Sequence, residues 1–256
     1  ARAAEDGFTI NNLTTGDLVA SLRSGLADFL AMPSHLLFIV AIYPIGAFLL
    51  AQLTYSLDLL PLFFPLVAGF AIIGPFVAVG LYEISRRRER GETPSWRDVL
   101  DVQRSPAWGS MLLVGALLTA LFLAWLFAAD RLYASIMGDR TATSVADFLA
   151  MVLTTRAGWT LIVVGHIVGF GFAALAFMVS AVSFPMLLDR EVGAGEVIAA
   201  SVRTVVRNPA VMALWAAIIA AGLMLGSALL FVGLVLVLPI LGHASWHLYR
   251  RAIRWC

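Results

Sequence analysis

Charge and cysteine are scarce in this sequence. Only 13% of its 256 residues are charged and 61% are apolar, whereas soluble domains have about 25% charged and about 45–50% apolar residues. Cys256 is the single cysteine, which excludes a disulfide framework and a CxxC metal or redox motif. Lysine is absent, and the net charge of +1 is too small to favour a nucleic-acid partner. The composition therefore indicates a membrane protein that does not bind nucleic acid.

Long apolar runs without charge are present instead. A helix needs about 20 such residues to cross the roughly 30 Å hydrocarbon core of a bilayer. Four runs have a suitable length, and a fifth, of roughly 40 residues, is long enough for two crossings at about 1.5 Å per residue. They are residues 35–57, 59–82, 105–129, 157–188 and 208–249. We predict six transmembrane helices, with tight turns at Asp58 and near Gly222, Gly226 and Ser227.

The distribution of arginine predicts the orientation of these spans. Short loops rich in basic residues stay in the cytoplasm. All but Arg131, Arg140 and Arg156 of the 17 arginines lie on one side of the predicted spans, together with both termini. Residues 1–34 also lack a basic segment followed by an apolar one, so we expect no cleavable signal peptide. The prediction is a multi-pass protein of a bacterial inner membrane with cytoplasmic termini.

The longest predicted outer loop covers residues 130–156. Ser144 and Asp147 have the spacing of a helix-capping box. Apolar residues then recur on one stripe, which predicts a short helix on the membrane surface. The stripe consists of Val145, Phe148, Leu149 and Val152.

Three segments share a pattern that suggests an internal repeat within a single membrane domain, residues 1–256. Each segment, 17–90, 94–190 and 194–254, has an amphipathic stretch, then a proline, then two apolar runs. The apolar stripes before the prolines are Leu18, Leu22, Leu26 and Phe29 in the first segment, Trp96, Val99 and Leu100 in the second, and Ile198, Val202 and Val205 in the third. We therefore expect an all-α fold of three helical hairpins, each preceded by an interfacial helix, around a pseudo-threefold axis.

Histidines are the first candidates for a cofactor site, because polar groups inside a membrane are costly and often functional. His243 and His247 are four residues apart and share a helix face, while His35 and His166 lie in other spans. A haem needs axial ligands at one depth, which His35 and His243 approach best. These four residues are weak candidates for cofactor binding. We expect no metal site, no bound cofactor and no catalytic residue.

Other features of the spans favour structural roles. Glu83 is followed one turn later by Arg86 and Arg87, which predicts a salt bridge at the end of a helix. Gly165 with Gly169 and Gly222 with Gly226 have GxxxG spacing, which lets helices approach closely inside the protein or against a partner. Prolines that interrupt helical hydrogen bonding stand at positions 44, 75, 185 and 239.

Two stretches that end predicted hairpins resemble a known family. They are Gly74-Pro75-Phe76-Val77-Ala78-Val79-Gly80-Leu81-Tyr82-Glu83-Ile84-Ser85-Arg86-Arg87 and Ser183-Phe184-Pro185-Met186-Leu187-Leu188-Asp189-Arg190. The sequence is similar to an uncharacterised family of bacterial integral-membrane proteins, from about Asp17 onward. Some members carry a loose cytochrome c oxidase-like label, which implies association with a respiratory complex. Four histidines are too few to ligate the metals of a catalytic oxidase subunit.

Three functions fit these features. The first is a non-catalytic accessory, assembly or scaffold subunit of a larger membrane complex, such as a respiratory one, with lipids and other integral-membrane subunits as partners. The second is a small-molecule transporter or channel with a site between the hairpins. Its predicted lining is Gln52, Thr54, His166, Ser180 and His243. The third is an intramembrane enzyme acting on lipid, or a haem protein that uses His35 and His243.

Overall fold

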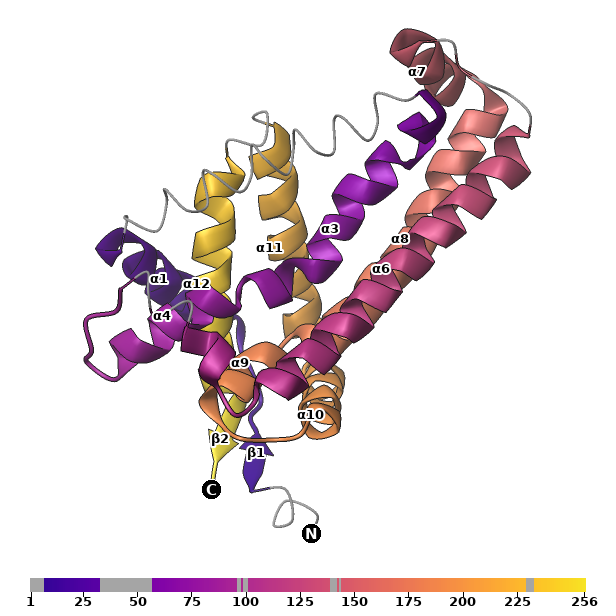
Figure 1. The fold of residues 1–256 in the computed structure, drawn as a ribbon. Helices are drawn as coiled ribbons and strands as arrows, with labels where there is room; N and C mark the ends of the chain where they lie inside the picture. Colours follow the sequence, from indigo (N-terminus) through magenta and orange to yellow (C-terminus); the bar gives the residue numbers. More distant parts are fainter. Residues whose placement is uncertain are drawn as a thin grey trace. The chain divides into compact units, whose positions relative to one another are not determined.

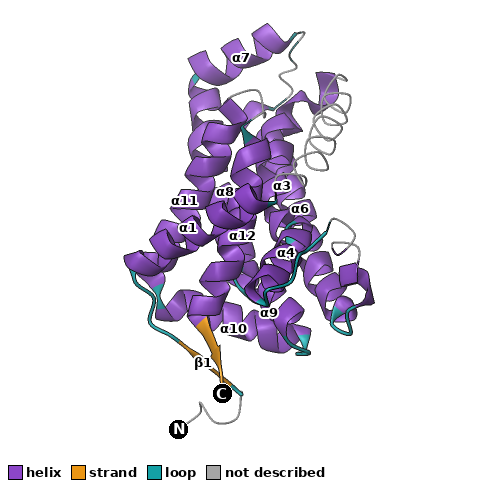
Figure 2. Cartoon of the chain, turned by 90° about the vertical axis from the view of Figure 1, so that its left-hand side faces the viewer, coloured by secondary structure: helices purple, strands orange, loops and turns teal. Residues whose placement is uncertain are grey.

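The computed structural model describes residues 7–32, 57–95, 98, 101–138, 142, 144–228 and 233–256. Helices make up most of this part of the chain, and two short strands complete it (Figure 2). The chain divides into two compact units. Unit 1 consists of residues 1–43, 75–115 and 177–256, and unit 2 of residues 44–74 and 116–176.

Helix α1, Thr15–Ala31, begins unit 1 with a capping box. Thr14 Oγ1 accepts a hydrogen bond from the Asp17 amide at 3.3 Å, and the Asp17 carboxylate accepts one from the Thr14 amide at 2.8 Å. The helix packs along α12, Leu234–Ala252 (Figure 1). A Cβ on Gly25 would lie 2.5 Å from the Ala244 nitrogen, so only glycine permits this approach.

Three helices that follow apolar segments pack against one another in unit 1. They are α4 (Val79–Glu89), α9 (Ser183–Asp189) and α12. Large side chains fill the region where they meet, and each is at most 1% exposed. They are Ile84, Phe184, Met186, Trp246, Leu248 and Tyr249. The side chains between the three helices are therefore shielded from solvent.

The remaining elements of unit 1 pack on these helices or pair with each other. The 3₁₀ turn η3, Val102–Arg104, packs on α4, while α10, Ala194–Arg207, packs on α9. Helix α11, Pro209–Ala228, packs on α12. The strands β1, Phe8–Ile10, and β2, Ile253–Trp255, pair antiparallel, with Thr9 opposite Arg254.

Unit 2 consists of long helices and a short surface helix. It contains the 3₁₀ turn η2 (Leu57–Leu62) and α7 (Val145–Thr154), together with most of α3 (Phe63–Val77), α6 (Trp108–Met137) and α8 (Arg156–Ser180).

Trp125 of α6 contacts both α3 and α8 in unit 2. Its Nε1–H donates to the Pro65 carbonyl oxygen at 2.9 Å, and its ring lies 5.8 Å from that of Phe172. A Cβ on Gly169 would lie 3.0 Å from the same indole. Gly169 therefore lets α8 approach α6 closely.

Four of the described helical segments are long and apolar enough to cross a membrane. They are Leu60–Glu89, Trp108–Met137, Arg156–Asp189 and Pro209–Ala228. The predicted run 35–57 lies almost entirely outside the described residues. Helix α12 is absent from the set because its second half carries His243, His247 and two arginines. The six-span arrangement is thus confirmed only as four spans.

Several predicted boundaries are wrong. Helix α11 continues through Gly222, Gly226 and Ser227 to Ala228, and α12 begins at Leu234. There Gly226 and Gly233 approach so closely that a Cβ on Gly233 would lie 2.8 Å from the Gly226 Cα. Helix α6 continues to Met137, so the predicted outer loop is shorter, and the β1–β2 pair was not predicted.

The predicted apolar stripes are only partly buried. In α1, Leu18 and Phe29 of the stripe are buried together with Ser21, Gly25 and Asp28, whereas Leu26 is 42% exposed. In α10 the buried face is small and partly polar, and Ile198, Val202 and Val205 are only half-buried. Trp96, Val99 and Leu100 lie outside the described residues. Small residues such as Gly25 allow close approach between helices.

Candidate functional site

A polar cluster is buried where α1, α4 and α12 meet. Asp28 comes from α1, Ser85 and Arg88 from α4, and His243 and His247 from α12. Asp28 is 6% exposed, Ser85 is fully buried and His243 is 2% exposed. Five residues from three segments that are far apart in the sequence thus form one site.

The Asp28 carboxylate is the acceptor at the centre of this cluster. Ser85 Oγ donates to Asp28 Oδ2 at 2.6 Å, and His247 Nε2 lies 2.8 Å from the same oxygen. Arg88 Nε lies 3.3 Å from Oδ1. Because Ser85 has one proton and gives it to Asp28, His243 Nδ1, at 2.8 Å, donates to Ser85. Both histidines therefore carry a proton on the nitrogen that faces the cluster.

Asp28 is held in its ionised form. Burial is the largest influence and raises its pKa, but hydrogen bonds from His247 and Ser85 and the charges of the two histidines outweigh it. The net result is a pKa below the ordinary aspartate value. The carboxylate thus remains charged at neutral pH and can pair with Arg88 and His247.

The geometry of the cluster suits a buried hydrogen-bond network better than nucleophilic catalysis. A serine nucleophile needs a base to take its proton and a path for substrate to reach its oxygen. Ser85 instead gives its proton to a carboxylate and is 0% exposed. Among the described residues, no group of three or more metal-ligating side chains has a geometry that could hold a metal ion.

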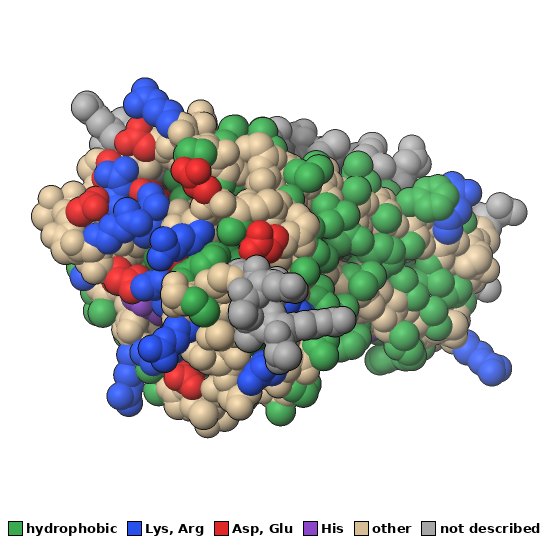
Figure 3. Space-filling view, turned by 90° about the horizontal axis from the view of Figure 1, so that it is seen from below, with side chains coloured by type: hydrophobic (Ala, Val, Ile, Leu, Met, Phe, Trp, Pro, Cys, Tyr) green, Lys and Arg blue, Asp and Glu red, His purple; other side chains and the backbone are tan. Residues whose placement is uncertain are grey.

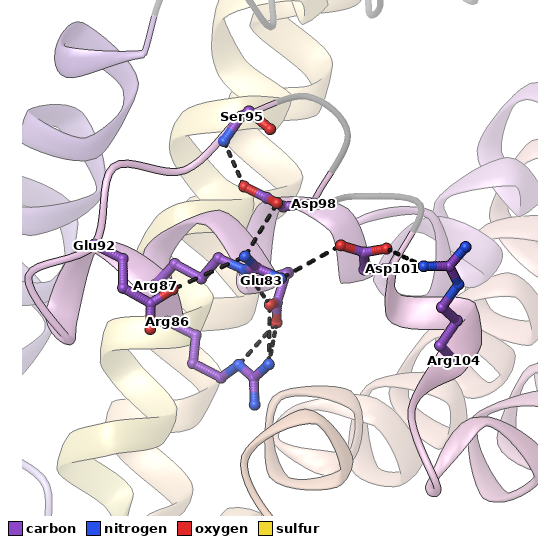
Figure 4. A network of polar contacts seen from close by, with 8 residues as sticks. All are labelled: Glu83, Arg86, Arg87, Glu92, Ser95, Asp98, Asp101 and Arg104. Atoms are coloured by element: carbon purple, nitrogen blue, oxygen red, sulfur yellow. Dashed lines mark hydrogen bonds and ion pairs between the residues drawn. The ribbon is translucent and has the colours of Figure 1, made fainter.

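A second network surrounds Glu83, which is buried in α4. Arg86 contacts its carboxylate through two nitrogens, with the closest approach 2.7 Å, and Arg87 Nε lies 2.7 Å away (Figure 4). Arg87 also reaches Asp98 at 3.0 Å and Asp101 at 3.7 Å. The predicted salt bridge at the end of the helix is confirmed, and it extends to the segment that precedes α6.

A third network of polar contacts connects α12 with α4 and α9. Arg250 pairs with Glu89 of α4 and Asp189 of α9, at 3.0 and 3.1 Å. Tyr249 donates to Asp189 at 2.8 Å, and Trp246 Nε1–H donates to Glu89 at 3.0 Å. One carboxylate from each of two helices therefore binds two side chains of the third.

The structure brings together only part of the predicted histidine set. His243 and His247 share the cluster around Asp28. His166 is exposed in unit 2, where its Nδ1 lies 2.7 Å from the Ile162 carbonyl oxygen and its ring lies 5.4 Å from that of Phe64. His35 lies outside the described residues.

The remaining predicted lining residues are not assembled into a site by the described contacts. Ser180 is buried in unit 1, as His243 is. Gln52 and Thr54 lie outside the described residues. The channel lining therefore stays a prediction.

Sequence reasoning missed Asp28 and Ser85. Asp28 stands on the same helix face as Leu18, Ser21 and Gly25, and only Leu18 of these belongs to the predicted apolar stripe. The spacing of Ser21 and Gly25, four residues apart, is a small-residue packing motif that could have indicated the face.

The fold and composition together define a class. Four long apolar helices, with exposed side chains such as Phe127, Ile167 and Phe170, and charged networks gathered in unit 1 are typical of a multi-pass integral membrane protein. On the face shown in Figure 3, hydrophobic side chains gather in one region and charged side chains in another. Such a protein contacts membrane lipids directly.

Comparison with protein families then confirms the resemblance seen in the sequence. Residues 63–189 match the model of a family described as "predicted integral membrane protein (DUF2189)", whose function is unknown. The match covers a shorter segment than the resemblance from Asp17 onward suggested. No curated protein and no solved structure matches the chain.

Proposed function

We propose that this protein is a non-catalytic accessory, assembly or scaffold subunit of a larger complex in a bacterial inner membrane, with a respiratory complex as one such machine. The carrying observation is the close packing where α4, α9 and α12 meet. Side chains such as Phe184, Met186 and Trp246 are at most 1% exposed there, which favours a structural role for this region.

Charge pairing supports the same proposal. The carboxylates of Asp28, Glu83 and Asp189 all bind arginine, histidine or tyrosine side chains of the same unit. Groups that are satisfied in this way rigidify a fold. Large apolar side chains such as Phe170, 74% exposed, and Met224, 69% exposed, remain available to lipid or to helices of other subunits.

The contacts in unit 1 also support the threefold repeat that forms part of this proposal. In each repeat, the element that precedes the apolar hairpin packs on the helix that ends the preceding repeat. The segment η3 packs on α4, α10 packs on α9, and α1 packs on α12, which closes the cycle between the first and last repeats. This arrangement and the arginine distribution support our proposal of three equivalent hairpins, six spans and cytoplasmic termini.

Co-purification tests the subunit proposal. The protein, tagged at its native locus, is extracted in mild detergent, and stoichiometric companions are identified by mass spectrometry. We expect other integral-membrane subunits at near-equal amounts. Ile167→Ala with Phe170→Ala alters one apolar face, and Met224→Ala with Leu225→Ala alters another. The pair that lies in the interface should lose the companions, and the other pair, which serves as its matched control, should retain them. Recovery of the wild-type protein alone would contradict the proposal.

The natural single cysteine tests the orientation. Cys256 is exposed, so a membrane-impermeant maleimide should label it only after the inner membrane is opened. A variant with Cys256→Ser and Ala150→Cys places the thiol on α7, which is predicted to lie outside. This variant should be labelled in intact spheroplasts. The reverse pattern would place the termini outside.

A transporter or channel is the second candidate, and the buried cluster around Asp28 favours it. Buried ionisable groups in membrane proteins often mark proton or ion paths. The test is proton flux in proteoliposomes, measured with an internal pH-sensitive dye. A flux that Asp28→Asn abolishes would support transport, and the absence of flux in the wild type would remove this alternative.

A further inference from the structure

A hollow of about 520 Å³ opens in unit 1 just beyond the ends of α9 and α12. Four arginines line it, together with one aspartate and a tryptophan. They are Arg190, Arg250, Arg251, Arg254, Asp17 and Trp255. The lining is therefore strongly basic and carries an aromatic wall.

Two of the four arginines are neutralised by neighbours and two are not. Arg250 pairs with Glu89 and Asp189, and Arg251 lies 3.5 Å from Asp17. Among the residues that the structure describes, neither Arg190 nor Arg254 forms an ion pair with a carboxylate. Two guanidinium groups at one hollow thus keep their full charge for an external anion.

The aromatic wall is fixed in position. Trp255 Nε1–H donates to Tyr249 Oη at 2.9 Å, and its ring packs edge-on against Phe8 at 5.4 Å. The guanidinium of Arg190 lies over the Trp255 ring, 5.4 Å from its centre. This stacking orients Arg190 and leaves its N–H groups available for hydrogen bonds.

We propose that this hollow binds a phosphate group, as carried by the headgroup of an anionic lipid or by free phosphate. Guanidinium groups match phosphate oxygens with paired hydrogen bonds. The position favours the lipid source, because Arg190 directly follows the apolar segment Arg156–Asp189 and stands beside a tryptophan, as interfacial residues do. The proposal is independent of the accessory-subunit function.

The test compares charge-matched variants of the full chain purified in nonionic detergent. Arg190→Gln with Arg254→Gln removes the two unpaired charges from the hollow. Arg23→Gln with Arg104→Gln removes two exposed charges outside its lining. Binding of dioleoylphosphatidylglycerol is followed by native mass spectrometry, and binding of inorganic phosphate by titration calorimetry.

We expect the hollow variant to bind phosphatidylglycerol at least about tenfold more weakly, because each basic residue contributes about 1 kcal/mol near anionic headgroups. The control should bind as the wild type does, and Arg190→Lys with Arg254→Lys should restore much of the affinity. Phosphate that binds and displaces the lipid would identify free phosphate as a ligand, and lipid binding alone would identify the headgroup. Equal binding by both glutamine variants, or no binding of either ligand by the wild type, would overturn the proposal.

Discussion

Different interactions stabilise the interiors of the two compact units. Unit 1 contains carboxylates with several partners each, of which Asp28 and Glu83 are buried and Asp189 is partly buried. In unit 2 the described contacts are mainly apolar, and one buried hydrogen bond, from Trp125 to the Pro65 carbonyl oxygen, joins two of its helices. Helices in lipid satisfy their backbone internally and pack through shape, whereas a polar interior needs specific pairing.

This difference predicts where each unit is vulnerable. Loss of one partner in a buried network leaves other charges unpaired, so unit 1 should be sensitive to single polar substitutions. Unit 2 should be sensitive to changes in shape at its glycine and tryptophan contacts. The predictions below probe this contrast.

The largest effect is expected for Asp28→Ala. The substitution leaves His247, Arg88 and Ser85 without their shared acceptor and should cost about 4 kcal/mol of stability. Hydrogen exchange measured by mass spectrometry should show faster exchange in α1 and α12 and unchanged exchange in α6 and α8 of unit 2. Asp130→Ala, at an exposed ion pair with Arg131, is the control and should change little. Faster exchange in both units would show that they are not independently stabilised.

A smaller effect is expected for Gly25→Ala. The added Cβ would lie 2.5 Å from the Ala244 nitrogen, so α1 and α12 must separate, at a cost of about 3 kcal/mol. Gly195→Ala in α10, where the Cβ meets open space, is the matched control. The melting temperature in detergent should fall for the first variant and hold or rise for the second. Equal melting temperatures would mean that the packing of α1 on α12 contributes little.

Trp125→Phe should affect unit 2 by about 1 kcal/mol, because it removes the hydrogen bond to the Pro65 carbonyl oxygen and keeps most of the ring. Exchange should increase in α3 and α6, while α1 and α12 remain protected. Trp159→Phe, whose indole is exposed and bonds only within its own neighbourhood, provides the comparison. An equal response to both substitutions would argue against a central role for Trp125.

The smallest effect on stability is expected from acidification. Because the pKa of Asp28 is lowered in the folded protein, its stabilising effect is fully present above its ordinary value of 3.8 and is lost as the pH falls through the lower folded value. The stability difference between wild type and Asp28→Asn should therefore shrink as the pH falls below about 4. A difference that does not shrink in this range would contradict the lowered pKa of Asp28.

The sequence predicted the apolar framework well. Runs of charge-free residues located the segments that became α3, α6, α8 and α11, because length and hydropathy alone decide which segments suit a bilayer. The pairing of Glu83 with Arg86 and Arg87 was also predictable, since it depends on spacing within one helix. One glycine of each GxxxG pair lies at an internal contact, Gly169 at Trp125 and Gly226 at Gly233.

The polar site was not predictable in the same way. Asp28, Ser85 and His243 come from segments about 57 and 158 residues apart, and no local spacing connects them. The predicted apolar stripe of α1 includes the buried Leu18 and Phe29 but also Leu26, which is exposed. The small residues Ser21 and Gly25 are buried on the same helix, and Gly25 allows the backbones of α1 and α12 to approach closely.

The packing of α1 on α12 also constrains the order of events during synthesis. Helix α1 leaves the ribosome about 200 residues before α12 is complete, which at about 5–20 residues per second is roughly 10–40 seconds. During this interval Asp28 lacks its histidine partners. The exposed apolar face of α1, with Val19, Leu26 and Leu30, can rest on the membrane surface meanwhile. The bilayer can therefore act as a temporary partner of α1 until the last helix of the chain is made.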